Sequence, residues 1–591
     1  MFKPNQDRID YSSKLEPPIG YETVYGIGTT YSMDLDTLLG ISIALGLSES
    51  VDNELSKDPL YILEALRRVS DKVLVFCEGG QIQAPEKRNE LYSLLEKMVF
   101  EVTMKNRASF HPKFWLIKYQ DEEKNPLYRL MVLSRNLTFD RSWDFAVTME
   151  GYTSEKADER NRPISDFLRY LRKSVKRGTG NKDQRALLNR ISKEIEKVSF
   201  RRDSRFYDHS FHPVGIPDYP IEKTDLFAKY HELFIISPFI SRFTIEKFKN
   251  KALIRPDRTL ITRKSEVPLL KQEDLEDFSV YSLKDLIVDG EDAISEDTDV
   301  SEGGLQRKQD IHAKVYLKTR GANTDLFIGS LNASKQACEK NVEFLLKLRT
   351  KRGQLSVKNL KDELFGSDEK DSPFEQVTEI PETEEKEEKE EDAERIIKDI
   401  VALKSTAECR HEEDGYGIHL EFRILQLSGK RVFIRPLLGI DDKELVEKVS
   451  FKRLRLDQVS MFFVVTVATE TSKVKRVLKI FVENIPEERD RSIVNRIIDS
   501  KERFIQYVTF MLGEDYFLSF LEYKTFNTNR MIFGMRESVP AIYEKMLRTV
   551  SRNPEKLNDI QKLIEMISDE QLIPEGFVEL YNEFQKVVEK S

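Results

Sequence analysis

Two of the seven histidines in this chain begin short motifs that match each other in residue types and in spacing. Each histidine is followed two positions later by a lysine and, after a stretch of similar length in both copies, by a serine and an asparagine that are also two positions apart. The first copy consists of His111, Lys113, Ser134 and Asn136, and the second of His312, Lys314, Ser330 and Asn332. Because histidine is rare in this chain, the repetition indicates one function shared by both copies.

Both copies lie in apolar runs that predict β-strands. On a strand, side chains at positions i and i+2 point to the same face. We therefore expect each histidine to lie beside its lysine, and each serine beside its asparagine. If two halves of the chain pack about a pseudo-two-fold axis, all eight side chains meet in one pocket.

That set of side chains suits a phosphodiester. Lysines neutralise the non-bridging oxygens, and serine and asparagine donate hydrogen bonds to them. Histidine can attack phosphorus and can also transfer protons near neutral pH. One imidazole would act as nucleophile while the other protonates the leaving oxygen, and water would then hydrolyse the phosphohistidine. Since the lysines supply the positive charge, we expect neither a metal nor another cofactor.

At these residues the chain resembles the phospholipase D superfamily, in which repeated H-x-K…S-x-N motifs build a paired site. The resemblance implies that His111 is the nucleophile and that His312 is the general acid and base. It also implies an acidic residue that supports the histidine of its own half. The candidates are Glu343 for the second half and Asp144 for the first.

Both copies lack the aspartate that usually follows the lysine in this family, because Lys118 and Thr319 stand in its place. This departure makes the chain more similar to the nuclease and tyrosyl-DNA phosphodiesterase-like branch than to the lipid-cleaving members. The resemblance then implies a metal-independent phosphodiesterase acting on DNA. We expect a nuclease of bacterial defence or restriction type, with a role in antiviral defence.

Two other functions stay open. One is a non-catalytic or conditionally active subunit of a DNA-processing complex that contains a helicase or another ATPase. With either function we expect a dimer or a complex subunit. The other is a phospholipase, which would need an apolar rim or an interfacial helix near the site. The sequence shows no such segment.

Composition limits the class of protein. A chain of 591 residues is too long for one core, so we expect several domains. The formal net charge of −9 argues against coating of nucleic acid by overall positive charge, but it allows a local basic groove. Three scattered cysteines suit a reducing compartment. No apolar run reaches the roughly 18 residues of a membrane span, so we expect a cytoplasmic protein without membrane contact.

The expected fold class is α/β, with duplicated phospholipase D-like α-β-α units that form one pseudo-two-fold site, plus a separate C-terminal α+β module. Strand and helix patterns alternate in both halves. The expected boundaries are 1–155 for the first half, 156–215 for a basic helical insertion, 216–365 for the second half, 366–395 for an acidic linker and 396–591 for a C-terminal recognition or partner module.

Local patterns predict the elements that position the motifs. In the two halves they predict helices at 35–47, 88–98 and 243–251, and strands at 73–77, 232–239 and 258–263. In the C-terminal module, the runs 419–425 and 431–435 predict one hairpin, and the runs 461–469 and 474–482 predict another.

Five basic residues of the insertion are candidate phosphate contacts beside the site: Lys173, Lys176, Arg177, Arg201 and Arg202. A solvent-exposed helical face explains them equally well. The acid-rich segment 289–309 directly precedes His312 in the sequence, and we expect a mobile loop that either gates the site or is disordered.

Overall fold

The computed structural model of the chain describes residues 11–47, 58–138, 142–175, 181–284, 310–366, 372–380, 388–423, 431–468, 473–512, 542–552, 554 and 556–588. The loop expected at 289–309 lies outside these described residues, as do Lys176 and Arg177. Much of the expected acidic linker lies outside them too.

Residues 21–201 build a first sheet around apolar strands. Its members are β1 (Tyr21–Thr29), β3 (Val73–Glu78), β5 (Val99–Val102), β6 (Phe114–Asp121), β7 (Pro126–Leu133), β9 (Ala146–Thr153) and β10 (Val198–Arg201). The strand order is β10-β9-β7-β6-β1-β3-β5. From β9 to β1 neighbouring strands are antiparallel, whereas β1, β3 and β5 are parallel. Every residue of β3 is buried, as expected for a parallel strand covered on both faces.

Residues 208–376 build a second sheet. Its members are β11 (Asp208–His212), β12 (Tyr230–Ile236), β13 (Ala252–Ile261), β14 (Ser279–Leu283), β16 (Val315–Arg320), β17 (Asn323–Gly329), β18 (Leu345–Lys351) and β19 (Phe374–Gln376). The order is β11-β18-β17-β16-β12-β13-β14-β19. The run from β18 to β14 repeats both the order and the strand directions of the run from β9 to β5. The protein is therefore α/β, with two halves of matching strand order.

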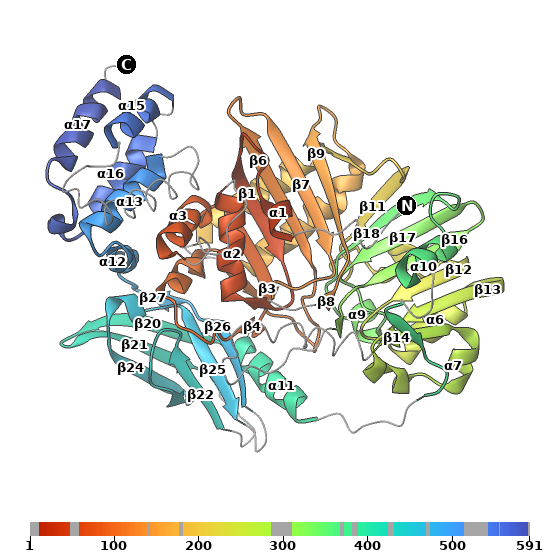
Figure 1. The fold of residues 1–591 in the computed structure, drawn as a ribbon. Helices are drawn as coiled ribbons and strands as arrows, with labels where there is room; N and C mark the ends of the chain where they lie inside the picture. The colour runs from red at the N-terminus through yellow and green to blue at the C-terminus, as the bar shows by residue number, and fades with distance from the viewer. Residues whose placement is uncertain are drawn as a thin grey trace.

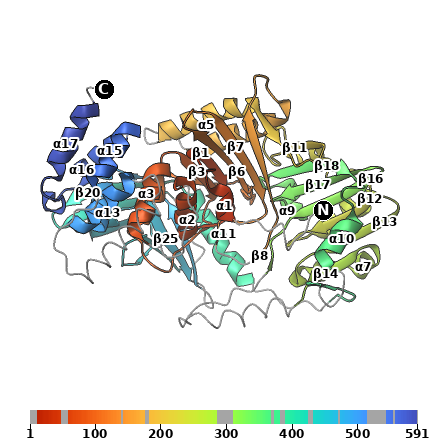
Figure 2. The same ribbon diagram turned by 45° about the horizontal axis from the view of Figure 1, so that its top comes forward.

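Helices cover both faces of the first sheet (Figures 1 and 2). The helices α1 (Tyr11–Leu15), α2 (Leu35–Gly46) and α3 (Pro59–Val69) share a core with one face, and α4 (Arg162–Ser174) and α5 (Lys182–Glu194) share a core with the other. That second core also contains Phe344 of the second half, whose ring centroid lies 4.8 Å from that of Phe114. The two halves are thus packed together through apolar side chains.

The second half carries shorter helices: α6 (Arg242–Lys249), α7 (Gln272–Asp277), α9 (Lys335–Glu339) and α10 (Val357–Phe365). Most predicted elements of the two halves are confirmed to within a few residues. The predicted helix at 88–98 is instead a 3₁₀ helix, Glu90–Lys97. The expected helical insertion contains α4 and α5, but it also supplies β10 to the first sheet and β11 to the second.

The C-terminal module contains two sheets and a group of helices. Its strands are β20 (Ser405–Glu412), β21 (Gly415–Phe422), β22 (Arg431–Pro436), β23 (Lys443–Glu444), β24 (Lys448–Leu454), β25 (Phe462–Ala468), β26 (Lys473–Lys479) and β27 (Val482–Glu483). Its helices are α11 (Glu388–Ala402), α12 (Glu488–Ile497), α13 (Lys501–Leu512), α15 (Ile542–Arg552), α16 (Lys556–Met566) and α17 (Phe577–Val588).

One of the two hairpin predictions is confirmed and the other is wrong. The strands β25 and β26 pair antiparallel, as predicted. By contrast, β21 pairs with β20 and β24, whereas β22 pairs with β25 in the other sheet. The side-chain alternation fixes which face of a strand is buried, but it does not fix which neighbour the strand pairs with.

The C-terminal module is joined to the first half by a shared sheet. The short strands β2 (Met33–Asp34) and β4 (Ile82–Gln83) extend the order to β2-β4-β26-β25-β22-β23. At the same junction Arg489 forms a buried ion pair of 2.7 Å with Glu96. The expected separate module is therefore continuous with the first half through backbone hydrogen bonds.

Candidate active site

The two H-x-K motifs lie immediately before strands, not within them. His111 and Lys113 precede β6, and His312 and Lys314 precede β16. The S-x-N motifs follow the ends of β7 and β17. Because β6 pairs antiparallel with β7, and β16 with β17, the start of one strand lies beside the end of the next. Each half therefore brings its four motif residues to one end of its sheet.

The two sets meet where the halves exchange backbone contacts. Phe110 and Val342 form a parallel bridge, and the His111 amide donates to the Val342 carbonyl at 2.9 Å. On the other side, the short strands β8 (Ser142–Trp143) and β15 (Asp310–Ile311) pair in parallel, with Ile311 opposite Trp143. These two crossings bring the motif ends of both halves together in one composite site.

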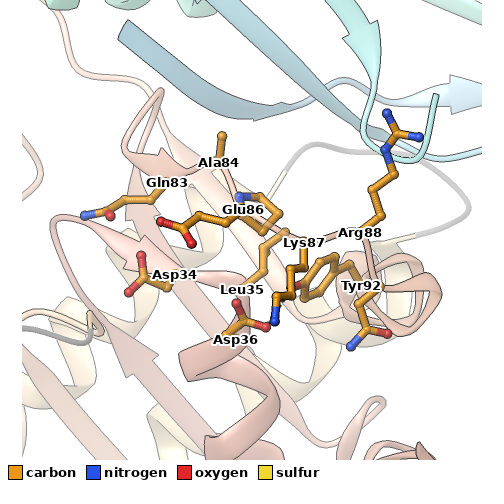
Figure 3. A pocket seen from close by; sticks show the side chains of 11 residues that line it. Asp34, Leu35, Asp36, Gln83, Ala84, Glu86, Lys87, Arg88 and Tyr92 are labelled. Atoms are coloured by element: carbon orange, nitrogen blue, oxygen red, sulfur yellow. Dashed lines mark hydrogen bonds between the residues drawn. The ribbon is translucent and has the colours of Figure 1, made fainter. Parts of the chain in front are cut away.

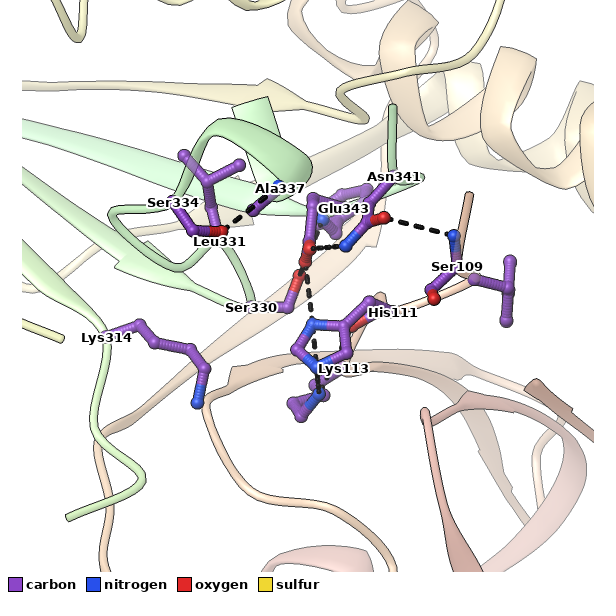
Figure 4. Close-up of polar contacts among 12 residues, drawn as sticks. Ser109, His111, Lys113, Lys314, Ser330, Leu331, Ser334, Ala337, Asn341 and Glu343 are labelled. Atoms are coloured by element: carbon purple, nitrogen blue, oxygen red, sulfur yellow. Dashed lines mark hydrogen bonds and ion pairs between the residues drawn. The ribbon is translucent and has the colours of Figure 1, made fainter. Parts of the chain in front are cut away.

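Glu343 supports the histidine of the opposite half. Its Oε2 atom lies 3.0 Å from Nδ1 of His111, and the carboxylate is completely buried (Figure 4). The expectation that Glu343 serves His312 of its own half is therefore corrected. The cause is the parallel Phe110–Val342 bridge, because the next residue in each of the two segments is His111 and Glu343 respectively.

The same correction applies to Asp144. Asp144, the expected support of His111, accepts a hydrogen bond of 2.9 Å from the Ser134 hydroxyl, while the Nδ1 atom of His111 faces Glu343. In the β8–β15 pair, the residues that follow Trp143 and Ile311 are Asp144 and His312. Asp144 thus occupies the position in the first half that Glu343 occupies in the second.

The two serines hold carboxylates, which corrects their expected role as phosphate donors. The Ser330 hydroxyl donates to Oε2 of Glu343 at 2.5 Å and accepts from the Phe344 amide at 3.0 Å. In the same way, the Ser134 hydroxyl donates to Asp144 and accepts from the Phe145 amide at 2.9 Å. Both serine side chains are fully buried, and each hydroxyl donates its proton to a carboxylate.

Each lysine contacts the histidine of its own motif, Lys113 at the ring and Lys314 at the backbone. The ammonium group of Lys113 is 3.2 Å from Nε2 of His111, and that of Lys314 donates to the His312 carbonyl at 2.5 Å. Figure 4 shows the Lys314 side chain directed toward the region occupied by His111 and Lys113. Both lysines are almost completely buried, so the site concentrates positive charge where an anion can offset it.

Both histidines have a lowered pKa. Burial lowers the pKa of His111 to about 4; Glu343 opposes this shift, while Lys113 and Lys314 add to it. Burial lowers the pKa of His312 to about 3, and the positive charges of Lys314 and Arg263 add to this shift. The ligand-free site therefore holds two neutral imidazoles at neutral pH. Since Nδ1 of His111 faces a carboxylate, its proton lies there and the lone pair lies on Nε2.

The two motif asparagines occupy equivalent positions beyond β7 and β17. The side-chain carbonyl oxygens of Asn136 and Asn332 are both buried and accept no hydrogen bond from the described part of the chain. A buried polar atom without a partner is costly. In each half this oxygen can therefore accept a hydrogen bond from a donor group of a ligand.

Three of the five candidate phosphate contacts are described. Lys173 is exposed on α4. Arg201 ends β10, where its guanidinium lies 4.6 Å from the ring centre of Tyr152, and Arg202 donates to the Phe206 carbonyl. The contacts of the two arginines are structural, and none of the three described residues forms a hydrogen bond or an ion pair with a motif residue.

Sequence reasoning missed four residues that surround His111. Asn341 donates to the other oxygen of Glu343 at 3.2 Å, and the Tyr31 ring lies 5.0 Å from the His111 ring. Glu78 and Lys398 contact the segment just before His111. Of the four, only Asn341 could have been recognised from the sequence, because it lies two positions from Glu343. The other three are far from both motifs along the chain.

Within the described residues, no group of three or more His, Cys, Asp or Glu side chains is arranged to hold a metal ion. A search of the same residues finds no helix with the length and apolar character needed to cross a bilayer.

Two cavities are lined by residues other than the motif histidines. One of about 410 Å³ is lined by both signs of charge, including Asp34, Asp36, Lys87 and Arg88 (Figure 3). The other, of about 650 Å³, lies between the halves and includes Lys105, Asn106 and Lys340. The second cavity adjoins Ser109 and Asn341 along the chain, so it is open space next to the site.

The matching strand order of the halves and the composite site of two H-x-K…S-x-N motifs define the class: an α/β protein whose site is built from two halves. No family model matches the chain, and no curated protein matches it.

Solved structures to which the chain is similar include three enzymes. Yeast tyrosyl-DNA phosphodiesterase is 13% identical with a TM-score of 0.34, covering 58% of this chain and 85% of that one. Phosphatidylserine synthase of Haemophilus influenzae Rd KW20 is 11% identical with a TM-score of 0.32, covering 62% and 84%. Polyphosphate kinase of Porphyromonas gingivalis is 12% identical with a TM-score of 0.30, covering 60% and 44%.

Proposed function

We propose that the protein is a metal-independent phosphodiesterase that acts through a phosphohistidine on His111. The observation that carries this proposal is the composite site, in which two histidine–lysine pairs meet and a buried carboxylate of one half fixes the ring of the other. A neutral imidazole with its lone pair on Nε2 is a nucleophile at neutral pH. The two lysines supply the positive charge that a phosphodiester needs.

The reaction has two steps. In the first, Nε2 of His111 forms a bond to phosphorus as the bond to the leaving oxygen breaks, and protonated His312 gives that oxygen its proton. In the second, His312 takes a proton from water, the water oxygen forms a bond to phosphorus, and the bond from phosphorus to His111 breaks. Both residues return to their starting protonation states, so no further reactant is needed.

His312 must be protonated for the first step, although burial and then the positive charges around it lower its pKa in the ligand-free site. A phosphodiester brings negative charge against Lys113 and Lys314, which offsets the part of that lowering due to their positive charges. Binding of the substrate thus favours uptake of the proton that the leaving oxygen then receives.

We propose DNA as the substrate. Phe239 follows β12, its side chain is 43% exposed, and the guanidinium of Arg263 lies 4.6 Å from its ring centre. Arg263 in turn acts electrostatically on His312. The loop of Phe239 is held beside Asn332, because the Ser237 hydroxyl accepts from the Ala333 amide at 2.8 Å and donates to the Phe239 carbonyl at 2.7 Å. An exposed aromatic ring paired with a cation suits stacking of a nucleobase next to the reacting phosphate.

The biological setting is proposed on the resemblance of the motifs alone: a cytoplasmic nuclease of bacterial defence or restriction type. In this setting the C-terminal module would recognise the target or a partner such as a helicase or another ATPase.

The test uses bis(4-nitrophenyl) phosphate and labelled single- and double-stranded DNA in excess chelator. We expect cleavage of both kinds of substrate. With the activated ester, whose leaving group needs little acid assistance, His312→Ala should retain a burst of one equivalent of nitrophenol, and His111→Ala should show none. Loss of all activity with chelator, or full activity of His111→Ala, would overturn the mechanism. Turnover of phosphatidylcholine without cleavage of DNA would overturn the proposal that DNA is the substrate.

A further inference from the structure

The helix α11 of the C-terminal module reaches the segment that precedes the nucleophile. Lys398, near the end of this helix, donates a hydrogen bond of 3.1 Å to the Ser109 hydroxyl. The Ser109 amide donates to Asn341 Oδ1 at 3.0 Å, and the Asn341 amide group donates to Glu343. A continuous chain of contacts therefore runs from Lys398 to the carboxylate that fixes His111.

A second path runs through Glu78 at the end of β3. Lys398 forms an ion pair of 3.3 Å with Oε1 of Glu78, whose Oε2 accepts from the Phe110 amide at 2.7 Å. Phe110 is also the residue whose bridge to Val342 aligns His111 with Glu343. Lys398 thus holds Ser109 directly and the Phe110 amide through Glu78.

The position of Lys398 is fixed by the packing of α11. This helix shares the core of the C-terminal sheets through Ile397 and Ile400. It also lies directly against Gly79 and Gly80, where an added Cβ would come within 2.6 Å of Val401 and 2.7 Å of Ile397. Only glycine allows this approach, so the backbone beside Glu78 is shaped to receive α11.

We propose that Lys398 is a positioning residue for the nucleophile, through which the C-terminal module controls the activity of the site. When α11 is docked, Lys398 holds Ser109 and Glu78, and they hold the backbone on which His111 meets Glu343. A partner or a DNA target that shifts α11 would change the alignment of His111 without touching it. This inference rests on the proposed function of the same site.

The pKa of Glu78 depends on the same two groups that its carboxylate contacts, Lys398 and the Phe110 amide. Burial raises the pKa of Glu78 to about 7, although Lys398 and the Phe110 amide oppose the shift and Glu101 adds to it. The other titratable groups around Glu78 are Cys77, Tyr31 and Tyr170, which stay neutral because burial raises the pKa of each. Removal of Lys398 would therefore leave Glu78 protonated at neutral pH, as a weaker acceptor for the Phe110 amide.

The experiment compares Lys398→Met with Lys398→Arg in the full chain, using bis(4-nitrophenyl) phosphate. Lys404→Met is the matched control, since Lys404 is exposed just beyond the same helix. We expect Lys398→Met to lower kcat by roughly tenfold to a hundredfold, the size of effect that a slight misplacement of a reacting group produces, with little change in KM. The acid limb of its kcat profile should move to higher pH. Lys398→Arg should restore much of the activity, and Lys404→Met should match the unchanged chain.

Two further measurements keep the test decisive. Ser109→Ala removes only one contact of Lys398 and should lower kcat in the same direction if Lys398→Met fails to fold. The rate at which diethyl pyrocarbonate modifies His111, read by mass spectrometry, requires no turnover and should fall in Lys398→Met while that of His212 does not. If the unchanged chain cleaves neither substrate, the proposed function fails but this labelling still tests the inference. An unaltered pH profile and unaltered labelling in a folded Lys398→Met protein would overturn it.

Discussion

Glu343 accepts hydrogen bonds from His111, Ser330 and Asn341, so its carboxylate both sets the tautomer of the nucleophile and fixes its ring. Glu343→Gln keeps the shape but presents a group that can also donate, which favours the wrong tautomer. We expect kcat to fall by roughly a hundredfold or more, with a small change in KM, in steady-state assays.

The control for this change is Glu339→Gln on α9, a carboxyl of the same type whose side chain is 40% exposed. It should leave kcat unchanged. Equal activity of Glu343→Gln and the unchanged chain would show that His111 does not depend on this carboxylate.

The lowered pKa of His312 predicts proton uptake when an anion binds. Between pH 5 and 7 the free imidazole is neutral, because its pKa is about 3. Tungstate would offset the charges of Lys113 and Lys314 and raise that pKa, so the complex binds a proton that the free protein does not. Calorimetry in buffers of different ionisation enthalpy should show uptake that grows as the pH falls from 7 to 5. Uptake that persists in His312→Ala would assign the proton to another group.

Phe239 offers a test of substrate class. Phe239→Ala should raise KM for single-stranded DNA by roughly tenfold, since base stacking on an aromatic ring contributes about 1–3 kcal/mol. It should leave bis(4-nitrophenyl) phosphate turnover nearly unchanged. Phe481→Ala, at an aromatic side chain of similar exposure in the C-terminal module, is the control. An equal loss of activity on both substrates would show that Phe239 supports the structure of the site and does not stack on a base.

At the scale of elements, Gly329 ends β17 directly before Ser330. Its φ of +156° and the Phe344 carbonyl, which an added Cβ would meet at 2.1 Å, leave no room for a side chain. We expect Gly329→Ala to lower both the melting temperature and kcat, because the backbone must move and Ser330 moves with it. Gly353→Ala is the control, since nothing lies within 4 Å of its added Cβ. A Gly329→Ala protein with unchanged kcat would contradict this.

The sequence predicted the elements better than their partners. Apolar runs identified β3, β12 and the hairpin of β25 with β26, because burial and short loops are local properties. The motif residues were recognised for the same reason. The pairing of His111 with Glu343 joins residues 232 positions apart, and it follows from a bridge between two sheet ends that no local pattern encodes. The predicted hairpin of β21 with β22 is wrong for the same reason, because no local pattern shows that these two strands belong to different sheets.

For the whole molecule, the ion pair of Arg489 with Glu96 links the C-terminal module to the first half. Both side chains are nearly buried. Arg489→Met would leave a buried carboxylate that has lost its charged partner, at a cost of about 3–5 kcal/mol. We expect a melting temperature lower by several degrees in calorimetry. Arg410→Met, at a surface pair with Glu408, should change it little. A separate, unshifted transition for the first half would show that the two parts unfold independently.

A carboxylate of one half supports the histidine of the other, and this has a consequence for how the two halves evolve. A substitution at position 343 affects the ring at position 111, and the register of β8 with β15 relates positions 144 and 312 in the same way. Each half is thus selected for its fit to the other. Among natural relatives of this chain, changes around Phe110–His111 should co-vary with changes around Val342–Glu343, and recombination that exchanges one half alone should yield inactive descendants.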